Sequence, residues 1–125
     1  MAVYCGTDII EIDRIKKSLL EIEGFRDRVF TEQEINYCEN RKNAKYESYA
    51  ARFAAKEAIS KALGTGLSGG ICLKQIEILN NGSGKPYAVF HGKAQEFYAE
   101  MKAKSMDVSI SHCGTYAVAY AVIEV

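Results

Sequence analysis

The pattern of apolar and polar positions predicts strands at both ends of the chain. Residues 2–10 alternate and are rich in β-forming side chains, and residues 106–112 and 116–125 form a pair around a short Cys-Gly-Thr turn. Two more strands are expected at residues 72–79 and 87–90, which are joined by the turn-forming run Asn-Asn-Gly-Ser-Gly. The later strands are therefore expected to pair antiparallel.

Helical spacing predicts most of the chain between the first strand and these later strands. After the first strand, large aliphatic residues recur at helical intervals, at Ile12, Ile15, Leu19 and Ile22. Thr31 and Glu34 form a capping-box sequence that begins a second helix. A long helix is expected over residues 44–63, with small residues along one face at 51, 54, 55, 58 and 62, and a short helix over residues 92–104.

This order of elements predicts one α+β domain over residues 1–125. The helices are grouped early and the antiparallel strands late, and the chain has no repeat, low-complexity tract or interior linker. We expect an antiparallel sheet packed with the long helix and with the shorter helices.

Composition narrows the class of protein. The chain has 16 basic and 16 acidic residues, so no overall field favours nucleic acid or a membrane surface as partner. Its four cysteines include no CxxC pair and it has only two histidines, so zinc-ligand spacing is missing and we expect free, mostly buried thiols. Residues 1–10 carry no positive residue before their apolar part, so no secretion signal is expected there, and the longest apolar run, residues 116–123, is too short to span a bilayer. A cytoplasmic setting is expected.

Two carboxylates indicate candidate metal chemistry. Asp8 lies in an apolar string, where an ionised carboxylate is costly unless it is paired. Glu57 and Lys61 are one turn apart on the long helix and share a surface. If each is considered alone, the plainer interpretation of Asp8 is a helix-capping or salt-bridged aspartate. The plainer interpretation of the Glu57–Lys61 pair is a solvated helical face. Taken together, two carboxylates from separate elements suit Mg²⁺, whose coordination a diphosphate substrate would complete.

Other candidate residues are each open to a plainer interpretation. Residues 64–69 match GxGxxG but follow a helix, so Gly64 is expected to end that helix, although such glycines also let backbone N–H groups reach a phosphate. His112 ends a strand and is either structural, a hydrogen-bond donor to a phosphate, or an acid–base group. Arg14 and Lys17, with Phe25 nearby, are either a solvated face or a docking strip for an acidic helix of a partner protein.

Several segments, in this order along nearly the whole chain, resemble the holo-acyl-carrier-protein synthases. They are Gly-Thr-Asp-Ile at 6–9, Ile-Asp-Arg-Ile at 12–15, Phe-Thr-Glu at 30–32, RFAAKEA at 52–58 with its continuation to Gly66, Gly-Lys-Pro at 84–86 and Ser-Ile-Ser-His at 109–112. The resemblance implies the 4'-phosphopantetheinyl transferase fold. It also implies Mg²⁺-dependent transfer of 4'-phosphopantetheine from coenzyme A to a serine of apo acyl carrier protein, in support of fatty acid biosynthesis.

The resemblance also implies roles for residues in the reaction. Asp8 and Glu57 would hold Mg²⁺, and Glu57, Lys61 and His112 would form the catalytic set. Coenzyme A would be bound by Arg52, Lys56, Lys61, Gly64 and His112. Of these, Arg52 and Lys56 would support either the phosphates or the site.

The remaining implied roles concern protein partners. Arg14 would engage the acidic recognition helix of the carrier protein, together with Lys17, and Phe25 would make an apolar contact. The family is homotrimeric, with coenzyme A at the boundaries between subunits.

Two alternatives stay open on the sequence. A Mg²⁺-dependent diphosphate hydrolase would use the same ligands with water as nucleophile and would need no protein partner. A coenzyme A-binding or carrier-binding module would use Asp8 and Glu57 in structural salt bridges. The residues do not identify the general base.

Overall fold

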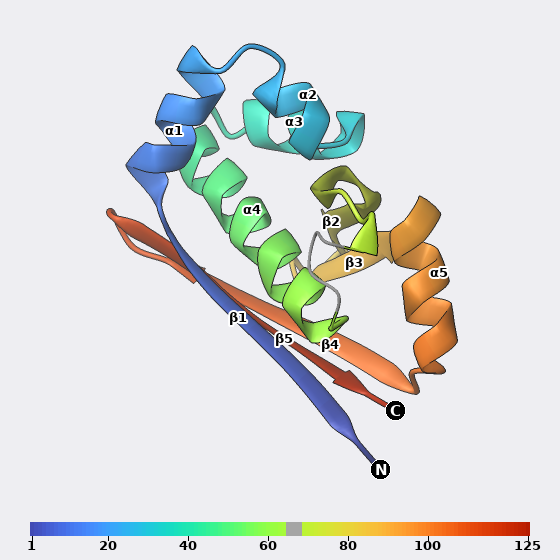
Figure 1. Ribbon diagram of the computed structural model, residues 1–125. Coiled ribbons are helices and arrows are strands. Elements are labelled where there is room, and N and C mark those ends of the chain that lie inside the picture. The colour runs from blue at the N-terminus through green and yellow to red at the C-terminus, as the bar shows by residue number, and fades with distance from the viewer. Residues whose placement is uncertain (65–68) are drawn as a thin grey trace.

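The computed structural model of the chain describes residues 1–64 and 69–125 (Figure 1). The elements before the undescribed segment are β1 (Val3–Glu11), α1 (Ile12–Glu21), α2 (Phe25–Val29), α3 (Glu32–Glu39), the 3₁₀ turn η1 (Lys42–Ala44) and α4 (Lys45–Ala62). The elements after it are the 3₁₀ turn η3 (Leu73–Gln75), β2 (Ile76–Asn80), β3 (Pro86–Phe90), α5 (Gly92–Met101), β4 (Ser105–His112) and β5 (Tyr116–Glu124).

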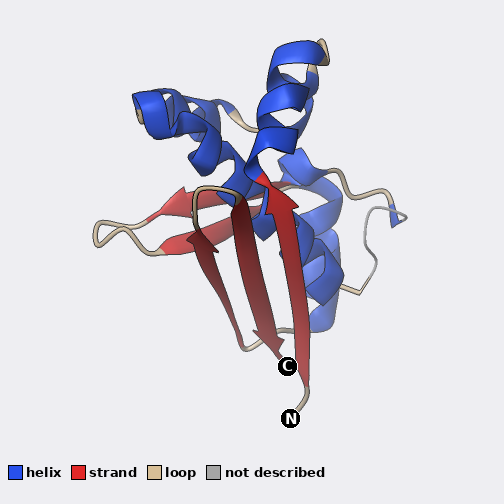
Figure 2. Ribbon diagram, turned by 90° about the vertical axis from the view of Figure 1, so that its left-hand side faces the viewer, coloured by secondary structure: helices blue, strands red, loops and turns tan. Residues whose placement is uncertain are grey.

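A three-stranded antiparallel sheet combines the two ends of the chain. Its strand order is β1-β5-β4, and Asp8 of β1 lies opposite Ala119 of β5. β2 and β3 form a separate antiparallel hairpin. Figure 2 shows this hairpin running across the direction of the three longer strands. The α+β architecture and the antiparallel pairing predicted from the sequence are confirmed.

The helix α4 lies along one face of the sheet at very short range (Figure 1). Its small residues are buried, as the sequence predicted: Ala51, Ala54, Ala55, Ala58 and Ala62. They face alternate alanines of β5, which are also buried: Ala117, Ala119 and Ala121. A Cβ atom on Gly6 of β1 would lie 1.9 Å from the carbonyl oxygen of Ala58, so only glycine permits this approach. The contact sets how closely β1 approaches the second half of α4.

The opposite face of the sheet is uncovered and carries exposed apolar side chains on two of its three strands. Its exposed large side chains come from β1 and β5: Ile9, Tyr116, Val118 and Tyr120. Among the residues that the structure describes, no helix packs on this face (Figure 1). None of the helices in residues 1–64 and 69–125 combines the length and the apolar character that crossing a membrane requires.

The structure corrects three details of the sequence-based prediction. Residues 72–75 are not strand but a 3₁₀ turn, which closes because Gln75 N donates to Cys72 O. The helix predicted over residues 92–104 ends at Met101, because Lys102 adopts a left-handed conformation with φ of 54°. Only Cys38 is buried, whereas the other three thiols are exposed, and Cys5 among them lies on the uncovered face of the sheet.

Candidate active site

Asp8 and Lys61 lie together where α4 crosses β1. Lys61 Nζ donates to Thr7 O at 2.9 Å and to Asp8 Oδ1 at 3.3 Å. Glu57 lies one turn earlier on the same helix. The close approach at Gly6, two residues before Asp8, brings the strand and the helix near enough for these contacts. The three charged residues that the sequence singled out therefore lie together.

The two carboxylates are close enough to influence one another. Burial raises the pKa of Glu57 above its ordinary value, the negative charge of Asp8 raises it further, and Lys61 lowers it. A cation between the carboxylates would relieve this repulsion. Mg²⁺ fits this pair of hard oxygen donors, since it keeps several waters and takes few ligands from protein. In the described part of the chain no group of three or more histidine, cysteine, aspartate or glutamate residues could hold a metal ion. A Mg²⁺ ion bound by two carboxylates commonly takes its other ligands from water and substrate oxygens.

Arg52 and His112 line a cavity of about 180 Å³ whose lining does not include Asp8, Glu57 or Lys61. The Arg52 guanidinium is buried, stacks 4.0 Å from the ring centroid of Tyr37 and donates to Ser48 Oγ at 3.3 Å and to Asn80 Oδ1. Within the described residues its Nε is buried without a hydrogen-bond partner. A guanidinium that lines a cavity is suited to an anionic group such as a phosphate.

A single chain does not bring His112 to the carboxylates. His112 Nδ1 lies 3.8 Å from Glu47 Oε2 at the beginning of α4. Glu47 and Glu57 are ten residues apart on that helix, a rise of about 15 Å. The predicted catalytic set is therefore divided between two regions of the molecule.

The structure corrects the interpretation of Lys56 as a residue that binds coenzyme A. Its ammonium is fully buried and donates to Glu34 Oε1 at 2.7 Å, Ile76 O at 2.8 Å and Leu73 O at 3.0 Å. Three acceptors use all three donors of a lysine. Burial lowers the pKa of Lys56, while the charge of Glu34 acts in the opposite direction. Lys56 has no donor left for a phosphate.

Gly64 caps α4 and uses its own backbone donor in doing so. Its φ is 84°, in the left-handed region that favours glycine, and its N–H donates to Lys61 O at 3.0 Å. The capping role is confirmed, and this N–H is not free for a phosphate. Residues 65–68 of the predicted glycine-rich loop lie outside the described residues.

The predicted partner-binding residues differ in how much surface they present. Arg14 and Lys17 are exposed on α1. Phe25 is half-buried, with its ring stacked at 6.3 Å on Phe53 and edge-on at 6.5 Å to Phe30. Phe25 is therefore partly engaged in the core, and only part of its ring is available to a partner.

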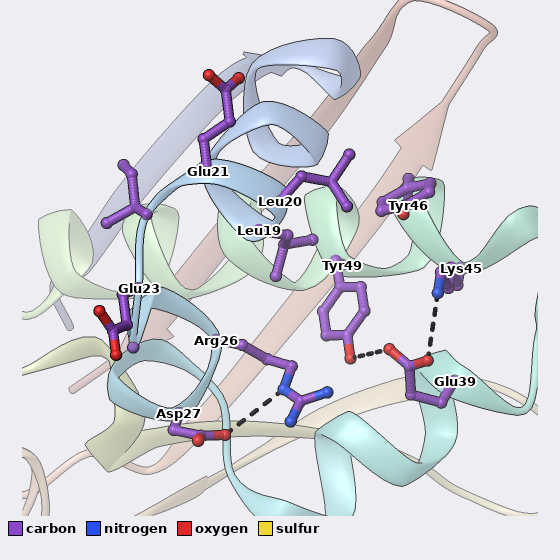
Figure 3. Close-up of a pocket in the computed structure, with 12 residues that line it drawn as sticks. Leu19, Leu20, Glu21, Glu23, Arg26, Asp27, Glu39, Lys45, Tyr46 and Tyr49 are labelled. Carbon is purple, nitrogen blue, oxygen red and sulfur yellow. Dashed lines mark hydrogen bonds and ion pairs between the residues drawn. The ribbon is translucent and has the colours of Figure 1, made fainter.

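A larger groove of about 450 Å³ lies between the end of α1, α2 and the beginning of α4 (Figure 3). On one wall, Glu39 accepts hydrogen bonds from Tyr49 Oη at 2.7 Å and from Lys45 Nζ at 3.3 Å. None of the predicted site residues that the structure describes lines this groove. Size alone therefore does not identify the reactive site.

The residues that contact the predicted site residues could not be identified from the sequence. Glu34 was interpreted only as a capping-box partner, and Asn80 only as a turn residue, because their contacts with Lys56 and Arg52 join elements distant in sequence. The one available signal was Lys56 itself, a lysine one residue away from a row of buried alanines.

Comparison with known proteins identifies the family to which the chain belongs. The profile of the 4'-phosphopantetheinyl transferase superfamily matches residues 4–121. The chain belongs to this superfamily of transferases, and within it to the holo-[acyl-carrier-protein] synthases. The synthase of Ruminiclostridium cellulolyticum is 56% identical over 98% of this chain and 92% of its own length. That of Koribacter versatilis is 41% identical over 99% of both chains.

Solved structures agree with this assignment. The holo-[acyl-carrier-protein] synthase of Neisseria meningitidis superposes with a TM-score of 0.85, at 28% identity over 98% of both chains. The enzyme of Bacillus anthracis, in complex with CoA (3',5'-ADP), gives a TM-score of 0.80 at 37% identity over 98% of both chains. The Helicobacter pylori enzyme in complex with coenzyme A gives 0.83 at 30% identity, over 96% of this chain and 99% of its own. The resemblance drawn from the motifs is confirmed.

Proposed function

We propose that residues 1–125 form one phosphopantetheinyl transferase domain that moves 4'-phosphopantetheine from coenzyme A to a serine of apo acyl carrier protein. Adenosine 3',5'-bisphosphate is the second product. The observation that carries the mechanism is the meeting of Asp8, Glu57 and Lys61 at the crossing of β1 and α4. The free thiols suit a reducing, cytoplasmic setting, where the reaction would supply holo carrier for fatty acid biosynthesis.

The charged residues at the crossing would act on the diphosphate of coenzyme A. Asp8 and Glu57 would hold Mg²⁺, which when bound would neutralise charge on the diphosphate oxygens. Lys61 Nζ donates two hydrogen bonds in this structure, to Thr7 O and Asp8 Oδ1, which leaves its third donor for a phosphate. The Lys61 side chain is half exposed, so this donor is accessible. The serine hydroxyl would attack the β-phosphorus as the adenosine bisphosphate leaves, a reaction that depends mainly on positioning and electrostatics.

A second copy of the chain would complete the site. The cavity of Arg52 and His112 is suited to the phosphates of the adenosine end, yet its His112 lies beside Glu47, about 15 Å along α4 from Glu57. The uncovered sheet face, with Val118 and Tyr120 exposed, is an apolar surface of the kind that copies of a protein bury. We propose a homotrimer in which one chain's carboxylates face the neighbour's Arg52 cavity, with coenzyme A at the boundary.

The carrier protein would dock on α1. Arg14 and Lys17 present positive charge to solvent there, which suits an acidic recognition helix and favours rapid association. Phe25 would add the exposed part of its ring. We assign no nucleic acid or membrane partner.

One incubation tests the reaction. The purified chain is mixed with apo acyl carrier protein and coenzyme A, with and without Mg²⁺, and the intact mass of the carrier is measured. A gain of one phosphopantetheinyl group only with Mg²⁺ is expected. Cleavage of coenzyme A without a mass gain would instead indicate a hydrolase, and binding without cleavage would indicate a binding module.

A further inference from the structure

Lys56 and Glu34 form a completely buried ion pair one residue before Glu57 on α4. Both side chains have an exposed fraction of zero, and Lys56 Nζ lies 2.7 Å from Glu34 Oε1. The other two ammonium donors bond to Leu73 O and Ile76 O. The pair therefore ties α4 to the chain segment that forms η3 and β2.

Glu34 extends the same network to two backbone amides. Its Oε1 accepts from Thr31 N at 2.9 Å, and its Oε2 accepts from Ile78 N at 2.8 Å. Every charged atom of the pair has hydrogen-bond partners, as a buried network requires. The network thus joins three parts of the molecule, α3, α4 and the β2 hairpin, at one point.

Stability alone does not account for such a pair. Removing a lysine and a glutamate from water is costly, and apolar side chains of similar volume in the same place are often as stabilising or more so. What directional hydrogen bonds supply is a defined position. The neighbouring face of α4 is made of alanines such as Ala54, Ala55 and Ala58, which allow close approach but do little to fix the helix along its axis.

We propose that Glu34 and Lys56 are positioning residues that hold α4 where Glu57 faces Asp8. Consecutive Cα atoms are about 3.8 Å apart, so a displacement of Lys56 carries Glu57 with it. The other partner, Asp8, is held independently of this network, because β1 pairs with β5 and Asp8 lies opposite Ala119. Loss of the buried pair would therefore leave both carboxylates present but misaligned. This inference rests on the proposed metal role of Glu57.

The test measures metal binding without turnover. Mn²⁺, as a substitute for Mg²⁺, is titrated by electron paramagnetic resonance into the full chain with coenzyme A and no carrier protein. The neutral pair variant Glu34→Gln/Lys56→Met avoids leaving one buried charge unpaired. Its control, Glu39→Gln/Lys45→Met, removes an exposed ion pair of 3.3 Å that joins the same two segments, α3 and α4.

We expect the buried-pair variant to bind Mn²⁺ about 10- to 100-fold more weakly, the range typical of partners that orient metal ligands. The control variant should bind as the wild type does, and thermal unfolding checks that both are folded. Glu34→Asp keeps both charges but shortens the side chain. Its Mn²⁺ affinity provides the test if the neutral pair variant does not fold. Wild-type affinity in the folded buried-pair variant, or in Glu34→Asp where the pair variant does not fold, would overturn the inference.

Glu57→Gln separates this inference from the proposed function. If Glu57→Gln loses Mn²⁺ binding while the buried-pair variant keeps it, the metal site is correct and only the positioning role is wrong. If Glu57→Gln binds Mn²⁺ as the wild type does, the metal role of Glu57 is wrong and the inference is wrong with it. A parallel assay with carrier protein should show the half-saturating Mg²⁺ concentration rising in the buried-pair variant, with the KM for the carrier unchanged.

Discussion

The charge state of single residues determines how strongly the candidate site favours a bound cation. Glu57 is a carboxylate whose pKa is raised by burial first and by Asp8 second, with Lys61 acting against both. In the metal-free protein its negative charge is therefore poorly accommodated. Such a perturbed carboxylate at the meeting of two elements is typical of a functional site.

This perturbation predicts how stability depends on pH. Between the ordinary glutamate value of 4.5 and the raised pKa of Glu57, the native state binds more protons than the unfolded state. The free energy of unfolding contributed by this group therefore falls as pH rises through that window. We expect metal-free Glu57→Gln to unfold at a higher temperature than the wild type near neutral pH, with the difference shrinking as pH falls towards 4.5.

Differential scanning calorimetry in the presence of a chelator measures this difference. Glu100→Gln is the matched control, since Glu100 is exposed on α5 and should behave as the wild type does. Added Mg²⁺ should raise the unfolding temperature of the wild type but not that of Glu57→Gln. A variant less stable than the wild type at neutral pH would contradict the repulsion between Glu57 and Asp8.

Residue by residue, the sequence predicted part of the candidate site. Asp8 and Glu57 stood out because an isolated carboxylate in an apolar string and a charged pair beside buried alanines both require explanation. The sequence could not predict that the Lys56 side chain points into the core. Consecutive residues of a helix are rotated by about 100° about its axis, and only tertiary packing decides which of them is buried. The same limit explains why Phe25 turned partly into the core.

Among the elements, the packing of α4 on β1 creates the site. The Cβ atom that any residue other than glycine would carry at position 6 meets the backbone of Ala58 at 1.9 Å, and backbone cannot rotate away as a side chain can. The helix must therefore move if Gly6 is replaced. Because Glu57 and Lys61 lie on the same helix, they would move away from Asp8 with it.

We expect Gly6→Ala to lower the free energy of unfolding by about 1–3 kcal/mol or more, the usual cost of overpacking a core. Gly82→Ala is the matched control, because Gly82 has nothing within 4 Å of its Cβ position, and we expect a change of less than about 0.5 kcal/mol. Urea unfolding measures both, and Mn²⁺ affinity should fall only in Gly6→Ala. Equal stability of the two variants would rule out the close contact.

The elements themselves were largely predictable, because their signals are local. The long helix over residues 44–63 and the terminal hairpin follow from periods of 3.6 and 2, and the structure has α4 and the β4–β5 pair in those places. The turn at residues 72–75 was not predictable, since the Leu73 carbonyl that it presents is bound by Lys56, seventeen residues earlier in the chain. A local pattern carries no information about such a contact.

At the scale of the whole molecule, one chain carries the parts of the site in separate regions and leaves an apolar sheet face uncovered. On this face Tyr120 Oη donates to Cys5 Sγ at 3.0 Å, and Ile9 and Val118 are exposed beside them. Burial of such a surface between copies would account for both features.

Val118→Glu is therefore expected to disrupt the proposed homotrimer. A charge introduced at this position, which is 38% exposed in the single chain, would be buried without a partner in an interface. Sedimentation should show a mass about one third that of the wild type and little transferase activity. Leu20→Glu, at a position 65% exposed on α1, is the control and should leave the mass unchanged. A wild-type mass for Val118→Glu would contradict this interface.

We propose that Asp8 and Glu57 together hold the cation that the transfer requires. The measurement that tests it most directly is the initial rate of carrier modification as a function of Mg²⁺ concentration, in Asp8→Asn, Glu57→Gln and the control Glu100→Gln. We predict that each of the first two variants loses at least about 100-fold in rate at limiting Mg²⁺, since a catalytic metal contributes several kcal/mol. Glu100→Gln should match the wild type. Wild-type rates in Asp8→Asn or Glu57→Gln at limiting Mg²⁺ would contradict the claim.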